Sequence, residues 1–276
     1  MNVEKEIKEI VLDDLKLEYH VYGSGTTHVL CFHGHGKSAD DFEFLANENR
    51  KIVSVNLFLH GESSFDASRI TTNLLQSRDV EKLLEKLFFK EKISEFHWVA
   101  YSQGGRFLLT TLPYFGSRVK SVHLLAPDGL NDKNFYSWSQ RRWWARSLFK
   151  RWTKRPHELI GISKALVRGK IIRPKIVDFL QYYAADREKL KLAYNTWAGF
   201  RKLRPSPKEI RNILEQKNIP FKLIIGEYDQ IITKSSAEKF LGEINRPEAL
   251  ISLPFGHDLF RDEVIETLQE NIKFKN

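Results

Sequence analysis

The sequence predicts an α/β protein with a mostly parallel, doubly wound sheet and an inserted helical cap, and three observations lead to this prediction. Short apolar runs that are typical of buried strands alternate with helical patterns along most of the chain. A stretch of 88 residues, 128–215, interrupts that alternation with a strongly basic helical pattern. A serine, Ser102, stands directly between a predicted strand and a predicted helix.

The predicted elements begin with a hairpin, after which strands and helices alternate. Such alternation favours parallel strands covered by helices on both faces of the sheet. The strands are expected near residues 6–11, 15–22, 28–33, 52–57, 96–100, 119–126, 220–225 and 249–253. The helices outside the insertion are expected near residues 38–48, 71–90, 104–114, 234–244 and 259–272.

The composition is that of an ordinary globular protein. The chain has 276 residues, 42% of them hydrophobic and 29% charged, and is long enough to bury a substantial core. A single cysteine, Cys31, excludes an internal disulfide and favours a reducing compartment. The first residues are too charged for a signal peptide, and no apolar run approaches the roughly 18 residues that span a bilayer. We therefore expect a cytoplasmic protein.

The basic character of the chain belongs to the insertion. Residues 128–215 contain 21 Lys and Arg against 8 Asp and Glu, a net charge of +13 in a chain whose total is +9. The segment is far too long for a loop between two neighbouring strands, where one crossover helix is enough. The prediction is an α/β core of residues 1–127 and 216–276, with 128–215 as a cap over the carboxyl edge of the sheet, where ligands bind in open α/β sheets.

Helical spacing supports the cap. Apolar residues recur every four positions in two runs, and Ser206 to Glu209 has the form of a capping box with Pro207 as the first helical residue. The two runs are Trp144, Leu148 and Trp152, and Ile176, Leu180 and Ala184.

Residues 141–155 form the most basic part of the cap, with seven cations, three tryptophans and no acid. One interpretation is a solvated helix whose Trp/Leu stripe packs on the core. A second is a surface that attracts an anionic substrate or makes weak contact with an anionic membrane. Nucleic-acid binding has no supporting motif, so we predict no nucleic-acid partner.

The serine lies in a small-x-Ser-x-Gly pattern, Ala100 to Gly104, between the strand and the helix. This junction forces a sharp turn that exposes the serine Oγ, and small residues on either side let the two backbones approach closely. The pattern is that of a nucleophile elbow.

Partners for this serine follow in the order Ser, Asp, His, each directly after a strand: Asp229 after 220–225 and His257 after 249–253. A histidine with an ordinary pKa near 6.5 can take the serine proton, and an aspartate can hold the imidazole in the required tautomer. Asp128 is the alternative acid because it follows the preceding strand, and Asp229 is preferred. His33 and His60 are interpreted as loop residues, and His97 and His123 as structural histidines of core strands.

Together with the loop His33-Gly34-His35-Gly36 after the third strand, these residues resemble the α/β-hydrolase family with a helical cap. The resemblance extends over nearly the whole core, with departures at Leu59 and Ala100, where the family usually has glycine. It implies a Ser102–His257–Asp229 triad, an oxyanion hole made by the backbone N–H groups of His35 and Gln103, and no metal or organic cofactor. The implied reaction is hydrolysis of an ester, thioester or related acyl bond in a small-molecule substrate, and the basic residues 141–155 would suit one that is anionic or amphipathic.

Two alternatives remain open. The run Tyr101 to Arg106 resembles the Tyr-Ser-x-Gly-Gly-Arg of menaquinone-pathway synthases, which implies a lyase or carbon–carbon hydrolase acting on an anionic substrate. The other is a non-catalytic binding protein on a hydrolase scaffold. The sequence predicts neither the substrate-binding residues nor the oligomeric state.

Overall fold

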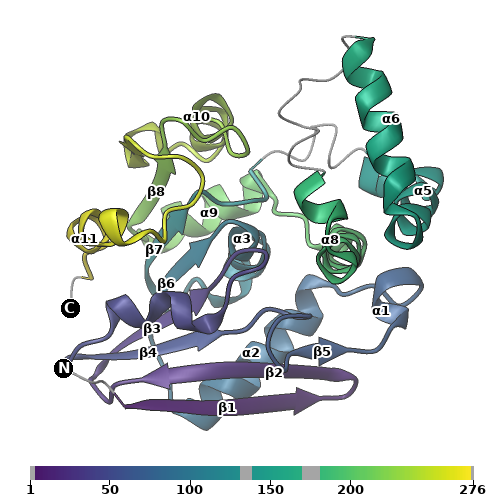
Figure 1. Ribbon diagram of the computed structural model, residues 1–276. Helices are drawn as coiled ribbons and strands as arrows, with labels where there is room; N and C mark the ends of the chain where they lie inside the picture. Colours follow the sequence, from purple (N-terminus) through teal and green to yellow (C-terminus); the bar gives the residue numbers. More distant parts are fainter. Residues whose placement is uncertain (1–3, 131–138, 170–180, 275–276) are drawn as a thin grey trace. The chain divides into compact units, whose positions relative to one another are not determined.

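The computed structural model describes residues 4–130, 139–169 and 181–274. Nine strands in these residues form one mixed sheet in the order β1-β2-β4-β3-β6-β7-β8-β9, with β5 paired to β2 (Figure 1). The sheet is antiparallel at the β1–β2, β2–β4 and β2–β5 pairs and parallel from β4 to β9. The strands are β1 (Lys5–Leu12), β2 (Leu15–Tyr22), β3 (Thr27–Phe32), β4 (Arg50–Val55), β5 (Ser64–Phe65), β6 (Phe96–Tyr101), β7 (Val119–Leu125), β8 (Phe221–Gly226) and β9 (Leu250–Leu253).

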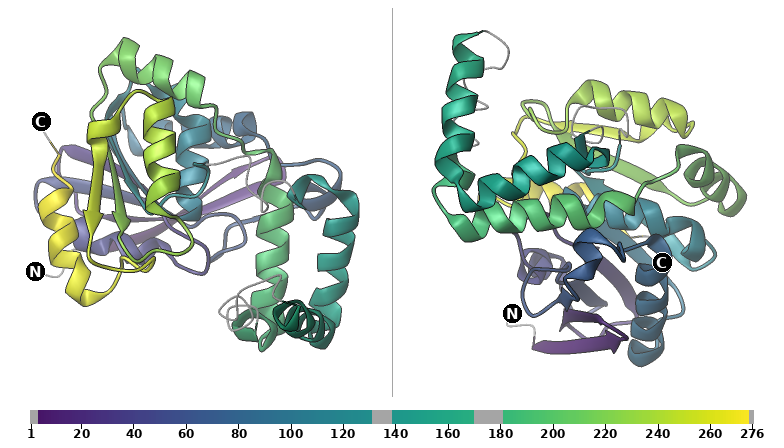
Figure 2. Two further views of the ribbon diagram at one scale, coloured as in Figure 1. Left: turned by 90° about the horizontal axis from the view of Figure 1, so that it is seen from above. Right: turned by 90° about the vertical axis from the view of Figure 1, so that its right-hand side faces the viewer.

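The central strands are buried on both faces, which explains why their sequences are mostly apolar and do not alternate regularly between apolar and polar residues. Side chains alternate between the faces, so Val99 and Tyr101 of β6 join one apolar cluster, while Trp98, the residue before Val99, contacts Phe115 on the other face. The first cluster includes residues of η1 (Ala39–Leu45) and α11 (Asp262–Asn271), two helices that contact each other. On the opposite face α2 (Ser77–Glu91), α3 (Gln103–Phe115), α9 (Pro207–Lys217) and α10 (Lys234–Glu243) are successive neighbours (Figures 1 and 2).

Two predicted helices differ from the observed ones. The segment expected to be helical over 38–48 is the 3₁₀ helix η1, and the helix expected over 71–90 begins only at Ser77 as α2, after the separate short helix α1 (Ser68–Thr71). The start of α2 has a local cause, because the Gln76 and Asp79 side chains cap each other's backbone N–H at its first turn. A further short 3₁₀ helix, η3 (Pro247–Ala249), precedes β9.

The chain divides into two compact units. The first contains residues 1–66, 76–132 and 203–276, and the second contains 67–75 and 133–202. These divisions differ from the predicted cap of 128–215. The helix α9 belongs to the first unit because Ile210 and Leu214 are buried and α9 contacts α3 and α10, whereas α1 belongs to the second.

The second unit is helical. It contains α1, α5 (Trp143–Lys154), α6 (Pro156–Arg168), α8 (Arg187–Gly199) and η2 (Phe200–Lys202). Its small core is made by Tyr194, Trp197 and Ala198 of α8, against which Ala145 and Phe149 of α5 pack. No helix of the described residues is long and apolar enough to span a membrane.

The stripe predicted on α5 (Trp144, Leu148 and Trp152) is wrong at Trp144, whereas Leu148 and Trp152 are partly buried. Phe149 contacts the rings of Tyr194 and Trp197 at centroid distances of 5.5 and 5.2 Å, while Trp144 is 45% exposed. The side chains that pack on the aromatic residues of α8 are Ala145 and Phe149, one position after Trp144 and Leu148, and the ring of Trp152 lies 6.5 Å from that of Phe149. The second predicted stripe includes Ile176 and Leu180, which lie outside the described residues.

A buried polar chain links two central strands. Ser121 Oγ lies 2.8 Å from His97 Nδ1 and 3.0 Å from His123 Nε2. The ring of Phe274 covers both imidazoles, at 4.8 and 5.5 Å between ring centroids. Burial lowers the pKa of His97 to about 4 and that of His123 to about 3, so both rings are neutral at pH 7, as expected of structural histidines.

The burial of these histidines predicts that acid destabilises the folded protein, and that replacing one of them reduces the loss of stability. In the unfolded chain His123 binds a proton below a pH of about 6.5, whereas the folded protein excludes it until about pH 3. The contribution of neutral His123 to the free energy of unfolding is therefore fully present above about pH 6.5. It falls as the pH drops from about 6.5 to about 3, by at most about 1.4 kcal/mol per pH unit for one group. Urea unfolding at pH 7 and pH 5 should show a smaller loss for His123→Leu than for the wild type, by up to about 2 kcal/mol. Equal losses would contradict the prediction.

Candidate active site

Four loops that carry the predicted site residues lie at one edge of the sheet. His35 follows β3, Ser102 follows β6, Asp229 follows β8 and His257 follows β9. Because these strands are parallel, their carboxyl ends are at the same edge. The topology therefore brings Ser102 next to His257, which is 155 positions away in the sequence.

Ser102 occupies a strained turn. Its φ of 45° and ψ of −116° are unfavourable for any residue that has a Cβ, and such backbone strain costs about 1–3 kcal/mol. Three backbone hydrogen bonds maintain the turn: Ser102 N–H donates to Leu125 O, and Ser102 O accepts from the amides of Gly105 and Asp128. At Gly104 a Cβ would lie 2.3 Å from Phe32 O, so only glycine lets α3 approach β3 this closely.

The predicted triad residues are in hydrogen-bonding contact. Ser102 Oγ lies 3.1 Å from His257 Nε2, and His257 Nδ1 lies 2.7 Å from Asp229 Oδ2. Ser102 and His257 are partly exposed, while the side chain of Asp229 is completely buried. The arrangement therefore presents a hydroxyl to solvent and connects it through an imidazole to a buried carboxylate.

The second oxygen of Asp229 is also occupied. Asp229 Oδ1 accepts hydrogen bonds from the backbone amides of Ile231 and Ile232, at 2.7 and 2.9 Å. These two donors fix the carboxylate so that Oδ2 points at His257. They also satisfy a buried charge that would otherwise be costly.

The alternative acid, Asp128, has another partner. Its two carboxylate oxygens lie 2.8 and 3.0 Å from Nε and Nη2 of Arg106, a bidentate pair. Arg106 is buried and also donates to Leu203 O. The geometry thus brings Asp229, and not Asp128, to His257.

The loop after β3 lies against the serine. A Cβ at Gly34 would lie 3.0 Å from Ser102 Cβ and 2.7 Å from the ring of Tyr101, so the loop passes within van der Waals contact of the turn. His35 follows Gly34, and Gln103 is the first residue of α3, where helix amides lack intrahelical acceptors. The two predicted oxyanion donors therefore belong to segments that flank Ser102.

Two histidines that the sequence assigned to loops hold this segment in place. His33 Nε2 accepts the amide of Leu57 at 2.9 Å, and His60 Nε2 accepts the amide of Gly36 at 3.0 Å. Each can accept only as a neutral imidazole. Burial lowers the pKa of His33 to about 3 and also lowers that of His60, so both rings keep this role at neutral pH. Leu59, where the family has glycine, takes a left-handed φ of 71° in the adjoining turn.

Three further residues support the site and were not predicted. The hydroxyl of Tyr101 donates to His257 O at 3.0 Å, which ties the histidine loop to β6. Lys37 Nζ lies 3.0 Å from Asp258 Oδ1, an ion pair that joins the loop after β3 to the residue after His257. A sequence signal existed only for Tyr101, which directly precedes the serine.

The comparisons with known proteins agree with this architecture. The chain matches the family model of the alpha/beta hydrolase fold over residues 27–264. No curated protein matches its sequence.

Solved structures resemble the chain over nearly its whole length. An α/β-hydrolase enzyme from a Medee basin deep-sea metagenome library has 15% identity and a TM-score of 0.69, over 96% of this chain and 95% of that one. A thermophilic esterase from Thermogutta terrifontis has 14% identity and a TM-score of 0.65, over 96% and 97%. The thioesterase domain from the curacin biosynthetic pathway has 14% identity and a TM-score of 0.62, over 97% and 99%. At these identities the likeness concerns the fold, and the predicted fold class is confirmed.

Proposed function

This chain belongs to the alpha/beta hydrolase family, and we propose that it is a serine hydrolase that cleaves a carboxylic ester, thioester or related acyl bond through an acyl-enzyme. One observation carries the proposal: Ser102, His257 and Asp229 form a continuous hydrogen-bonded chain at the carboxyl edge of the sheet. The strained turn at Ser102 supports it, because such strain is typical of functional sites.

In the proposed first half-reaction, Ser102 Oγ attacks the carbonyl carbon of the substrate while His257 Nε2 takes the hydroxyl proton. Asp229 accepts the Nδ1–H of the imidazole and offsets the positive charge that the ring acquires. The carbonyl oxygen becomes an oxyanion, to which the backbone amides of Gln103 and His35 would donate. Such a donor typically contributes about 3 to 4 kcal/mol to the transition state.

The tetrahedral intermediate then collapses. The bond to the leaving group breaks as His257 returns its proton to the leaving oxygen or sulfur, and the acyl group stays on Ser102. Water attacks this acyl-enzyme while His257 takes its proton, and the bond to Ser102 then breaks as His257 returns that proton to Ser102 Oγ and the carboxylic acid leaves. The reaction requires no redox step and no group beyond the chain and water.

The lyase alternative rests on a resemblance that includes Arg106, and in the structure this side chain is paired with other protein groups. Arg106 completes the six-residue resemblance to menaquinone-pathway synthases, yet its guanidinium is buried against Asp128 and Leu203 O. A guanidinium held in this way does not present its donors to an anionic substrate, so we favour the hydrolase.

The test is covalent labelling followed by turnover. A fluorophosphonate probe should modify the wild-type protein on the peptide that contains Ser102, because the probe reacts with a hydroxyl that a neighbouring base activates. p-Nitrophenyl esters of graded acyl length should then be hydrolysed, and EDTA should leave the rates unchanged.

Two variants serve as controls for the labelling. Ser102→Ala should not be labelled, whereas Ser235→Ala, which changes an exposed serine of α10, should be labelled like the wild type. A wild-type protein that resists the probe and turns over no ester would support the non-catalytic scaffold and end the proposal.

A further inference from the structure

The helix α5 is packed on one side only. Ala145 and Phe149 face the aromatic core of the second unit, and no side chain of α5 is fully buried. Since a helix repeats every 3.6 residues, positions 143, 147, 150 and 154 share the opposite side. That side carries Trp143, Ser147, Lys150 and Lys154.

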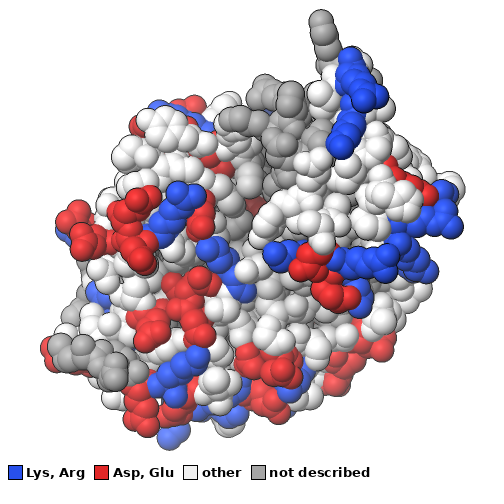
Figure 3. Space-filling view, in the orientation of Figure 1, with Lys and Arg blue, Asp and Glu red and all other residues white. Residues whose placement is uncertain are grey.

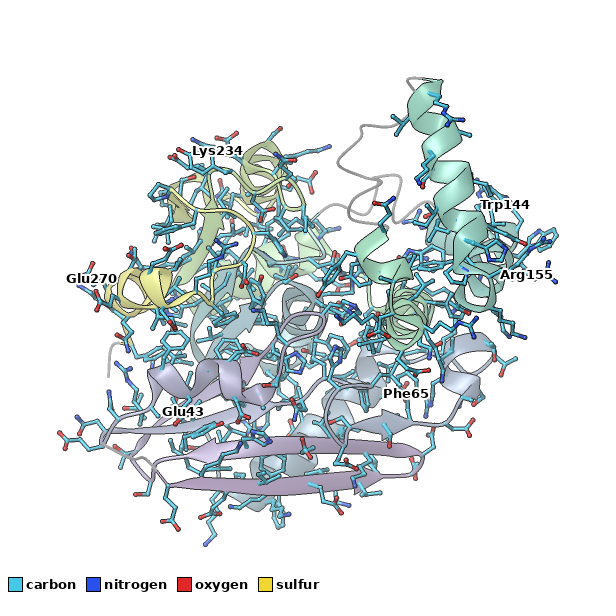
Figure 4. The ribbon with its side chains drawn as sticks, in the orientation of Figure 1. Glu43, Phe65, Trp144, Arg155, Lys234 and Glu270 are labelled. Carbon is cyan, nitrogen blue, oxygen red and sulfur yellow. The ribbon has the colours of Figure 1, made fainter. Side chains whose placement is uncertain are left out.

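The outward side combines indoles with positive charge. Trp143 is 74% exposed and Trp144 is 45% exposed, and Lys150, Arg151 and Lys154 are exposed as well. Figure 4 shows Trp144 and Arg155 at the outer edge of the helical unit, and Figure 3 shows Lys and Arg gathered over the same part of the surface. Two adjacent exposed tryptophans are unusual on a solvated helix, because each indole leaves a large apolar area in water.

Among the described residues, the acidic partner of this region pairs with its arginines and not with its lysines. Glu158 of α6 pairs with both Arg151, at 2.7 Å, and Arg155, at 3.3 Å. Within the described part of the chain, no carboxylate lies within ion-pair distance of Lys150 or Lys154. Ser147, Lys150, Arg151, Lys154 and Arg155 together line a surface hollow of about 370 Å³.

We propose that this face, defined by Trp143, Trp144, Ser147, Lys150, Arg151 and Lys154, binds the surface of an anionic phospholipid bilayer. Indoles favour the headgroup region, where the ring body leaves water and the N–H stays hydrated. Cations beside them are attracted to lipid phosphates, and each Lys or Arg near such a surface strengthens binding roughly five-fold. The combination of exposed tryptophan and unneutralised lysine on one helix side favours a bilayer over a soluble anion, which would make no use of the indoles.

The experiment is sedimentation of the full-length protein with vesicles. Wild type should sediment with phosphatidylglycerol vesicles, remain in solution with phosphatidylcholine vesicles, and dissociate as salt is raised, since the field is screened within about 8 Å at physiological ionic strength. Lys150→Gln combined with Lys154→Gln should weaken binding by at least about ten-fold. Trp143→Ala should weaken it independently, and because all three side chains are exposed, the fold should be retained.

A matched control removes the same charge elsewhere. Lys234→Gln combined with Lys239→Gln changes two exposed lysines of α10 and should bind vesicles like the wild type. Equal weakening in both lysine pairs, or no sedimentation of wild type, would overturn the proposal. So would binding to single-stranded RNA as tight as to vesicles and insensitive to Trp143→Ala, because that would identify a general polyanion surface. The measurement is independent of the proposed reaction, and Ser102→Ala should still bind.

Discussion

Replacing Ser102 with alanine is expected to reduce kcat by a factor of about 10⁶ if the effect matches other serine hydrolases. The substitution removes one oxygen, the only atom that could attack the substrate carbonyl in the proposed mechanism. No other hydroxyl lies within hydrogen-bonding distance of His257 Nε2 among the described residues. The measurement is kcat on the p-nitrophenyl ester that the wild type hydrolyses fastest.

The fold should survive this substitution. Alanine at φ 45° experiences the same backbone strain as serine, and the three backbone hydrogen bonds at this residue do not involve the side chain. The urea midpoint of Ser102→Ala should therefore remain close to that of the wild type. Activity above a tenth of the wild type in a folded variant would refute the assignment of Ser102 as the nucleophile.

The sheet could be predicted because its central strands are short, apolar and separated by clear helical patterns. Every strand of the parallel part was predicted to within two residues at each end. The two-residue strand β5 was missed because Ser64 and Phe65 are too few to show alternation. The start of α2 at Ser77 was missed because the apolar spacing extends upstream of it, while Gln76 and Asp79 cap the helix there.

Periodicity located α5 but could not determine which side packs. Trp144 and Leu148 have the same four-residue spacing as Ala145 and Phe149, so either pair could face a core. The choice depends on the Tyr194 and Trp197 rings of α8, about 50 residues away. The side of α5 that packs is therefore determined by contact with a distant segment, and the local spacing of apolar residues cannot predict that contact.

In the candidate site, too, some residues could be predicted from the sequence and others could not. Chain order and strand ends predicted Ser102, Asp229 and His257, because parallel strands bring these positions to one edge whatever their separation. The contacts that orient them, such as Tyr101 with the His257 carbonyl and Lys37 with Asp258, join loops that are remote in sequence. Those contacts depend on loop conformations, which no spacing rule predicts.

Replacing Asp229 with asparagine should lower kcat by about 10⁴, the effect known for the equivalent change in a serine protease. The amides of Ile231 and Ile232 donate to Asp229 Oδ1, so they would hold the oxygen of an asparagine on their side. Its NH₂ group would then face His257 Nδ1, which would have to accept a hydrogen bond. The imidazole would carry its proton on Nε2, and a protonated Nε2 cannot take the proton of Ser102.

Asp128→Asn is the matched control, since it removes the same charge from the rival acid. Its expected effect is on stability: Arg106 would lose the carboxylate that neutralises it, and the free energy of unfolding should fall by about 1 to 3 kcal/mol, less than for a fully buried pair because the Asp128 side chain is 26% exposed. Its kcat should stay within a few-fold of the wild type. Comparing the two variants by kcat and by urea unfolding therefore distinguishes the two charges. The charge of Asp229 orients the general base, whereas that of Asp128 stabilises the first turn of α3. If the two results are exchanged, the acid of the triad is Asp128.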